Sequence, residues 1–153
     1  MNLDFRPTDQ KIFSKTVTIN APASQVWQVL TTPELMKKWM MPDIEINIIT
    51  DWKVGSPILM HGKMNGKNFV NKGTVLQFEP EKTLQYTHLS SISRLPDRPE
   101  SYSTMEFDLQ PNENQTRLTL RLKNFPTESI YKHLTFYWTV TLEIIKRLVE
   151  EQD

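Results

Sequence analysis

The sequence predicts an α+β domain in which a curved antiparallel β-sheet wraps around a long C-terminal helix, with two short helices after the first strand. From residue 43 to residue 123, apolar and polar residues alternate with the period of half-buried strands. Residues 127–150 have helical periodicity instead, and two segments with helix-start signals follow the first strand. The 153 residues suit one core and are too few for two. We therefore expect a single domain over residues 1–153, with its core at about 11–150.

The N-terminal part predicts one strand and two short helices. Residues 13–19 alternate and are typical of a strand. We expect the cap of the first helix at Asn20 or Ala21, because a proline suited to the first helical turn follows. Residues 32–34 (Thr-Pro-Glu) repeat that signal for the second helix. Pro42 should end the second helix, since proline disfavours α geometry in the residue before it.

The middle of the chain predicts successive antiparallel hairpins. Asn65-Gly66 is the strongest turn signal, because a tight two-residue turn needs positive φ at both positions. Gly73 predicts a bulge or a close backbone approach. Residues 91–101, with two prolines and mixed charge, predict an exposed loop. The inward strand positions hold apolar side chains, one glycine and one histidine: Ile44, Ile46, Ile48, Ile58, Met60, Gly62, Met64, Leu84, Tyr86, His88, Met105, Phe107, Leu109, Leu118, Leu120 and Leu122.

The C-terminal helix, which Thr127 is expected to cap, is apolar around much of its circumference. At ~100° per residue its apolar arc is about 200° wide, twice the stripe of an ordinary surface helix. A helix this apolar needs a concave partner, and a long curved sheet provides one. The arc comprises Ile130, Leu134, Tyr137, Trp138, Val140, Thr141, Leu142, Ile144, Ile145, Leu148 and Val149.

The composition excludes several classes of function. Eighteen basic and 18 acidic residues give zero net charge, so the chain lacks the excess of basic residues that is typical of a nucleic-acid binder. The absence of cysteine excludes disulfides, thiolate catalysis and iron–sulfur clusters. No apolar run exceeds three residues, so no membrane span is expected. The first eleven residues have no apolar stretch and predict no secretory signal, which with the missing cysteines favours a cytoplasmic location.

A series of short motifs occurs in one order along almost the whole chain. They are Ile19-x-Ala21-Pro22 with Val26-Trp27, Thr32-Pro33-Glu34 with Trp39, Val54-Gly55, Gly73-x-Val75 with Pro80, Leu84-x-Tyr86-Thr87, Thr116-Arg117-Leu118-Thr119-Leu120, Phe125-Pro126, and Trp138-x-x-x-Leu142 through Leu148. In these motifs the sequence resembles the helix-grip proteins of the Bet v 1-like, or START/SRPBCC, superfamily. Within it, the chain is similar to bacterial homologues of the activator of the 90-kDa heat-shock protein ATPase.

The resemblance implies a deep cavity between the sheet and the C-terminal helix. It implies no single chemistry, because members of the superfamily bind lipids, steroids or plant metabolites, cyclise polyketides, or act through protein contacts. The sequence also departs from the family. Gly55-Ser56-Pro57 stands where two adjacent glycines are usual, and His88 stands where an aromatic is frequent. We expect no room in this chain for the additional N-terminal domain of the co-chaperone that names the family.

The predicted ligand-binding residues come from elements that should surround this cavity: Trp39, Met60, Tyr86, His88, Met105, Phe107, Tyr137, Trp138 and Thr141. Core packing is the alternative interpretation for most of them. His88 shares the inward parity of Tyr86, so its imidazole either contacts a ligand or bonds to a neighbour or water at the rim. Tyr137 and Thr141 place hydroxyl groups in the middle of an apolar face, where each needs a partner.

No catalytic residue, metal site or cofactor is predicted. The three histidines are far apart in sequence and have no ligand-spaced companion: His61 should point outward and His133 lies at the edge of the helix's apolar arc. No serine lies in a nucleophile-elbow motif. Glu106 and Asp108 have outward parity and predict a wetted strand face rather than an acid–base pair.

Three hypotheses for function follow. The leading one is a non-catalytic binder of a small apolar or amphipathic molecule. The second, suggested by the family name, is a chaperone-associated protein-interaction module. In that case Phe136, on the polar face of the last helix, would be a partner or dimer contact, the chain being a monomer or a homodimer. The third is a polyketide cyclase- or lyase-like enzyme that uses polar groups of the cavity, with His88 the first to test.

Overall fold

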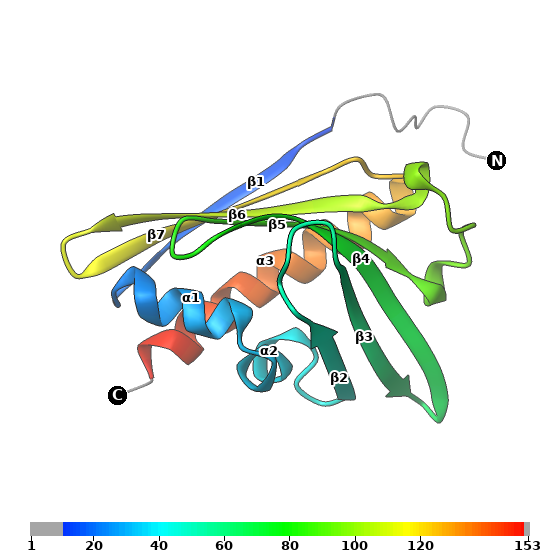
Figure 1. The fold of residues 1–153 in the computed structure, drawn as a ribbon, viewed down its shortest axis with the longest axis horizontal. Coiled ribbons are helices and arrows are strands. Elements are labelled where there is room, and N and C mark those ends of the chain that lie inside the picture. The colour runs from blue at the N-terminus through cyan, green and yellow to red at the C-terminus, as the bar shows by residue number, and fades with distance from the viewer. Residues whose placement is uncertain (1–10, 152–153) are drawn as a thin grey trace.

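The fold has two layers, a seven-stranded antiparallel sheet and a long helix, α3, with two short helices beside them (Figure 1). The computed structural model describes residues 11–151. Residues 1–10, where the sequence predicts no secretory signal, and 152–153 lie outside the described part. The elements are β1 (Phe13–Ile19), α1 (Ala23–Thr31), α2 (Pro33–Met40), β2 (Glu45–Thr50), β3 (Pro57–Met64), β4 (Lys67–Glu79), β5 (Thr83–Ser90), β6 (Ser103–Asn112), β7 (Gln115–Lys123) and α3 (Glu128–Glu150).

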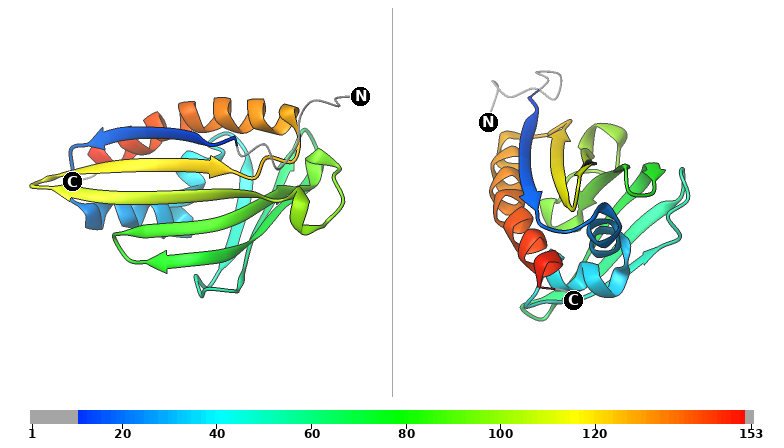
Figure 2. Two further views of the ribbon diagram at one scale, coloured as in Figure 1. Left: turned by 90° about the horizontal axis from the view of Figure 1, so that it is seen from above. Right: turned by 90° about the vertical axis from the view of Figure 1, so that its left-hand side faces the viewer.

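The strand order β1-β7-β6-β5-β4-β3-β2 makes β1 and β2 the two edges of the sheet. Figure 2 shows the sheet curving from β1, beside α3, round to β2, beside α2. Helix α3 packs on β1, α1 and α2. The α+β fold class, the long helix held by a curved sheet and the two short helices after β1 confirm the prediction. Among residues 11–151, no helix is both long and apolar enough to cross a membrane.

The β3–β4 hairpin and the β4–β5 pair show how glycine shapes the sheet. Asn65 and Gly66 form the two-residue turn with φ of 54° and 79°, as predicted. A Cβ atom at Gly73 would collide with the Thr87 carbonyl oxygen, so Gly73 marks a close backbone approach. The irregularity in strand register lies further along, between Val75 and Gln77. Of the two readings proposed for Gly73, the close approach is therefore the correct one.

The helix starts agree with the sequence in two of three cases. Thr32 and Thr127 are the N-caps of α2 and α3, and the Thr127 hydroxyl accepts a hydrogen bond from the Ile130 N–H at 3.1 Å. The prediction that Asn20 or Ala21 caps α1 is wrong, because the cap is Pro22. The Ala21 N–H turns back to the Ile19 carbonyl, and the Asn20 N–H donates to Glu150 instead. Both residues are thus held in the turn before the helix.

The buried face of α3 is narrower than its sequence predicts. Its fully buried side chains are Leu134, Trp138, Thr141, Leu142, Ile145 and Val149. Val140, which the apolar arc included, is 47% exposed, because the sheet and the short helices cover only one side of α3. Phe136 is 72% exposed, on the polar face where the sequence placed it. Helical periodicity predicted the correct side of α3 but overestimated the width of its buried face.

The loop between β5 and β6 is more ordered than the exposed loop expected for residues 91–101. It contains two single-turn 3₁₀ helices, Ser91–Ser93 and Pro99–Ser101, and the side chain of Ser101 is buried. Asp97 pairs with Lys72 of β4 and accepts a hydrogen bond from the Tyr102 hydroxyl at 2.6 Å. These two partners lower the pKa of Asp97, whereas burial and Asp97 raise that of Tyr102 to about 12. The loop is therefore fastened to the sheet at its middle.

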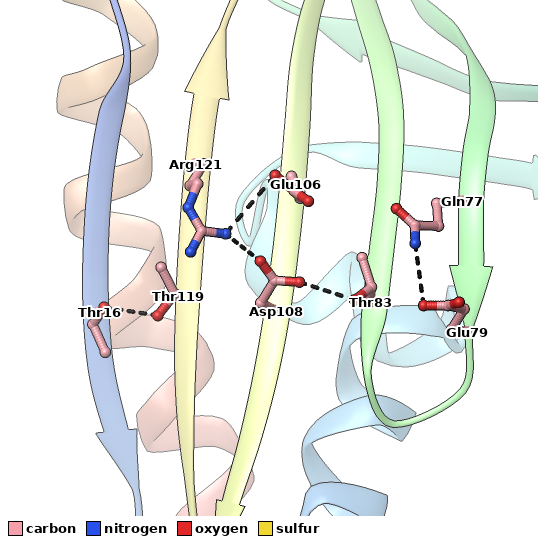
Figure 3. Close-up of polar contacts among 8 residues, drawn as sticks. All are labelled: Thr16, Gln77, Glu79, Thr83, Glu106, Asp108, Thr119 and Arg121. Atoms are coloured by element: carbon pink, nitrogen blue, oxygen red, sulfur yellow. Dashed lines mark hydrogen bonds and ion pairs between the residues drawn. The ribbon is translucent and has the colours of Figure 1, made fainter.

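The convex face of the sheet carries polar side chains that bond across strands (Figure 3). Arg121 forms ion pairs with Asp108 and, at 3.8 Å, with Glu106. The Thr83 hydroxyl donates to Asp108 at 2.9 Å. Both carboxylates thus lie on the outer face, as predicted, and both pair with the single guanidinium of Arg121. They have no access to the concave side of the sheet.

Candidate ligand cavity

A cavity of about 460 Å³ lies between the concave face of the sheet and α3. Strands β3 to β6 form its floor, α3 covers it, and the C-terminal end of α2 and the β5–β6 loop close two sides. Figure 1 shows that loop beside the N-terminal end of α3. The lining residues are Met40, Met41, Met60, Met64, Asn71, Tyr86, His88, Leu89, Ser90, Ile92, Ser93, Ser101, Ser103, Met105, Ser129, Ile130, His133, Leu134, Tyr137 and Trp138.

Small side chains on the floor explain why this part of the interior is hollow. Cross-strand pairing places Ser90 opposite Asn71, and His88 opposite Ser103. A serine side chain is too short to reach across to the helix layer. Further along the same strands, Tyr86 and Phe107 stack at 6.2 Å and fill the space under α3. Inward-facing side chains occur along the whole length of these strands, and the size of those side chains determines where the interior is open.

Methionines form much of the remaining wall. Of the six methionines in residues 11–151, five line the cavity, from α2, β3 and β6. The exception, Met36, is packed in the core. An unbranched, polarisable side chain adapts its rotamer to ligands of different shape. The wall is consequently both apolar and adaptable.

The polar side chains of the wall are hydroxyls, an amide, an indole and imidazoles. Among the described residues, the lining contains no Asp, Glu, Lys or Arg. Burial, and secondarily the nearby His133, lower the pKa of His88 from 6.5 to about 4. Burial raises the pKa of Tyr86 well above its usual value, and that of Tyr137 to about 12. At neutral pH, His88 and both phenols therefore carry no charge.

The hydroxyl of Tyr137 has the partner that its position requires. It donates a hydrogen bond to the carbonyl oxygen of Met40, the last residue of α2, and a bond from Thr141 partly offsets the rise of its pKa. A carbonyl in the last turn of a helix accepts no hydrogen bond from an N–H of the same helix, so the Tyr137 hydroxyl supplies the missing donor. It also ties α3 to α2 at the edge of the cavity.

Other polar atoms of the wall have no partner in the described residues. The Asn71 side-chain oxygen and the Trp138 indole N–H are buried and make no hydrogen bond. The imidazole of His88 and the hydroxyl of Ser103 also make none to the described residues, and both residues line the cavity. Native interiors contain few such groups, because an unpaired buried polar atom is costly. Their concentration around one cavity makes this the candidate binding site.

Six of the nine predicted binding residues lie on the cavity wall: Met60, Tyr86, His88, Met105, Tyr137 and Trp138. The other three, Trp39, Phe107 and Thr141, lie behind the wall in the core. The Trp39 indole donates to the Val29 carbonyl at 2.8 Å, which joins α2 to α1. Phe107 packs edge-on against Trp138 at 5.5 Å. Parity alone did not distinguish a wall residue from a core residue one layer deeper.

Sequence reasoning missed most of the polar part of the wall. Asn71 shares the inward parity of Val75 on β4, and this signal was available in the sequence. Ser93 and Ser101 lie in or beside the loop, which has no periodicity to follow. His61 is exposed, as predicted, whereas His133 is exposed yet contributes to the cavity lining. Within residues 11–151, no three histidine, aspartate or glutamate side chains are grouped to hold a metal ion.

An antiparallel sheet that grips a C-terminal helix, with a cavity between the two, defines the helix-grip proteins of the Bet v 1-like, or SRPBCC, superfamily. More narrowly, the model of the Activator of Hsp90 ATPase homolog 1-like protein family matches residues 20–150, and the chain belongs to this family. The resemblance stated from the sequence is thereby confirmed. No curated protein matches the chain.

Solved bacterial structures agree with this assignment. The solution structure of ChR145 from Cytophaga hutchinsonii is 35% identical, with 92% of this chain and 94% of that chain covered and a TM-score of 0.77. NE0264 from Nitrosomonas europaea is 27% identical, with 93% and 96% covered and a TM-score of 0.75. CV1439 from Chromobacterium violaceum, at 20% identity, 92% and 98% coverage and a TM-score of 0.78, shares the fold.

Proposed function

We propose that this protein binds a small hydrophobic or amphipathic molecule in the cavity between the sheet and α3, without catalysing a reaction on it. The observation that carries the proposal is the cavity itself, about 460 Å³ of open interior with an apolar wall and unpaired polar groups. This volume is within the range of small-molecule sites, about 300–1,000 Å³. The absence of cysteine supports the cytoplasm as the place of action.

Burial of ligand carbon would supply most of the affinity, at roughly 25 cal/mol for each Å² removed from water. The wall supports binding rather than catalysis. General acid–base chemistry needs a titrating group near its working pH, and the low pKa of His88 makes it a weak base. The paired carboxylates Glu106 and Asp108 lie on the opposite face of the sheet.

The direct test is a screen of neutral and charged hydrophobic compounds by thermal shift, with hits verified by native mass spectrometry. Binding should raise the melting temperature and add one ligand mass per chain. Ser103→Leu, which fills the floor of the cavity, should remove both effects, whereas the exposed Ser24→Ala should preserve them. If no compound class binds the wild-type protein, the proposal is wrong.

A further inference from the structure

We propose that the cavity selects an uncharged ligand that carries carbonyl or hydroxyl oxygens along one edge, and that His88 and Ser103 bind this edge. The inference rests on the proposed function and specifies the ligand that the same cavity takes. It derives from the distribution of polar groups around the wall, from the missing countercharge, and from the groups that lack partners.

The polar groups are gathered on one side of the cavity floor. Strand register places His88 of β5 directly opposite Ser103 of β6, and Asn71 of β4 opposite Ser90 of β5. The next strand outward contributes methionine, since Met60 of β3 lies opposite Asn71. In this row of paired residues, polarity therefore changes across the strands, from polar at β6, β5 and β4 to apolar at β3, while Met105 lies at the next inward position of β6. We call His88, Ser103 and Asn71 the polar edge.

The methionine side continues beyond the sheet. Met60 and Met64 of β3 share this wall with Met40 and Met41 at the end of α2. A ligand that fills the cavity thus meets four thioethers on one flank, and hydroxyl, amide and imidazole groups with the single thioether of Met105 on the other. Such a wall fits a molecule whose polar atoms lie along one side. It fits less well a detergent-like molecule with one charged head.

The polar edge can bond a neutral oxygen but cannot neutralise an ion. The lining residues described here include no lysine or arginine to pair with a carboxylate, and no acid to pair with an amine. His88 is held neutral, so it offers one N–H donor and one nitrogen acceptor rather than a positive charge. An ionised group placed against the polar edge would lose its hydration without gaining a countercharge there, which is strongly unfavourable.

Two polar groups of this edge are available to bond a ligand oxygen. The Ser103 hydroxyl and the His88 imidazole make no hydrogen bond to the described residues and line the open space. A carbonyl or hydroxyl oxygen placed between these cross-strand neighbours would bond to both. Because a hydrogen bond between neutral groups contributes modestly, each should change affinity by several-fold rather than by orders of magnitude.

The experiment compares three probes by isothermal titration calorimetry near neutral pH: phenylhexanol, its carboxylate counterpart phenylhexanoate, and butylbenzene, which has no oxygen. We expect the affinity for phenylhexanol to be at least about tenfold higher than the affinity for phenylhexanoate, because only the carboxylate must be buried without a countercharge. Ser103→Ala and His88→Leu should each weaken phenylhexanol binding by about three- to tenfold. Butylbenzene should bind both variants as tightly as wild type, since it makes no use of the polar edge.

Ser24→Ala and His61→Leu are the matched controls, because both residues are exposed and lie outside the cavity lining. Neither should change the affinity of any probe. If phenylhexanoate binds as tightly as phenylhexanol, or if the polar-edge variants bind phenylhexanol like wild type, the inference is overturned and the proposed function stands. If none of the three probes binds wild type although the wider screen finds ligands, the inference is overturned; if the screen finds no ligand either, the proposed function fails with it.

Discussion

The interior between the sheet and the helices has two halves, which differ in the side chains that the sheet turns inward. In the half we call closed, Phe107 and Trp39 pack around Trp138, and Phe78 stacks on Trp52 at 5.4 Å. In the open half, toward the β5–β6 loop, the inward positions hold serine, asparagine and histidine, and a cavity remains. Both halves follow the inward parity of β-strands. The closed half therefore stabilises the fold, whereas the open half is available for binding.

The largest expected effect is on stability, in the closed half. Phe107→Ala removes a fully buried ring that contacts Tyr86 and Trp138, and should lower the free energy of unfolding by about 4 kcal/mol. Urea denaturation followed by tryptophan fluorescence measures this loss. A loss below about 1 kcal/mol would show that the closed half is not the stabilising part.

A second expected effect depends on pH and concerns His88. Its folded-state pKa is lowered to about 4, so the unfolded chain takes up a proton on this residue at higher pH than the folded chain does. The stability due to the neutral imidazole is full above pH 6.5 and is lost as the pH falls toward 4. His88→Leu should therefore lose about 3 kcal/mol less stability than wild type between neutral pH and pH 4.

Denaturation curves at several pH values test this prediction, with His61→Leu as the control for an exposed histidine. The control should follow the wild-type pH dependence. Identical acid profiles for wild type and His88→Leu would mean that the imidazole is as well solvated in the folded protein as in the unfolded chain.

A smaller effect is expected at the boundary of the two halves. Tyr137→Phe removes the hydrogen bond to the Met40 carbonyl oxygen and should cost about 1 kcal/mol, because that carbonyl loses its partner. Its melting temperature should fall by a few degrees with little change of fold. An unchanged melting temperature would indicate that the carbonyl has access to water and that the helices do not depend on this contact.

The smallest effect on stability is expected in the open half. Met64→Ala shortens a half-buried side chain on the cavity wall, where few atoms pack against it, and should cost less than about 1 kcal/mol. It should nevertheless weaken binding of hydrophobic probes, because the apolar wall is reduced. A loss of stability as large as that of Phe107→Ala would contradict the distinction between the halves.

The sequence was sufficient for the strands, the helices and the side of each element that faces inward. Parity placed Met60, Tyr86 and Met105 around the cavity, because a strand has only two faces. It did not predict where the interior is hollow, since that depends on whether side chains from two layers meet. Trp39 and Phe107 fill the space they face, whereas Ser101 and Ser103 do not.

Two further predictions failed for the same reason. Each depended on which parts of the folded chain cover one another, and a local sequence pattern does not contain that information. The width of the buried face of α3 depends on how far the sheet curves, so Val140 was wrongly assigned to that face. The β5–β6 loop closes one side of the cavity because Asp97 fastens it to Lys72 and Tyr102, partners that are distant in sequence or lie beyond the loop. Neither arrangement leaves a periodic signal in the sequence.

Backbone amide chemical shifts of the isotope-labelled protein with bound phenylhexanol would locate the ligand directly. Binding in the open half predicts saturable shifts concentrated at the cavity wall, around Asn71, His88 and Ser103, with small changes around Phe78 and Trp52 in the closed half. It also predicts that Ser103→Leu abolishes these shifts. Shifts centred on the exposed Phe136, or an equal response of wild type and Ser103→Leu, would contradict binding in the open half.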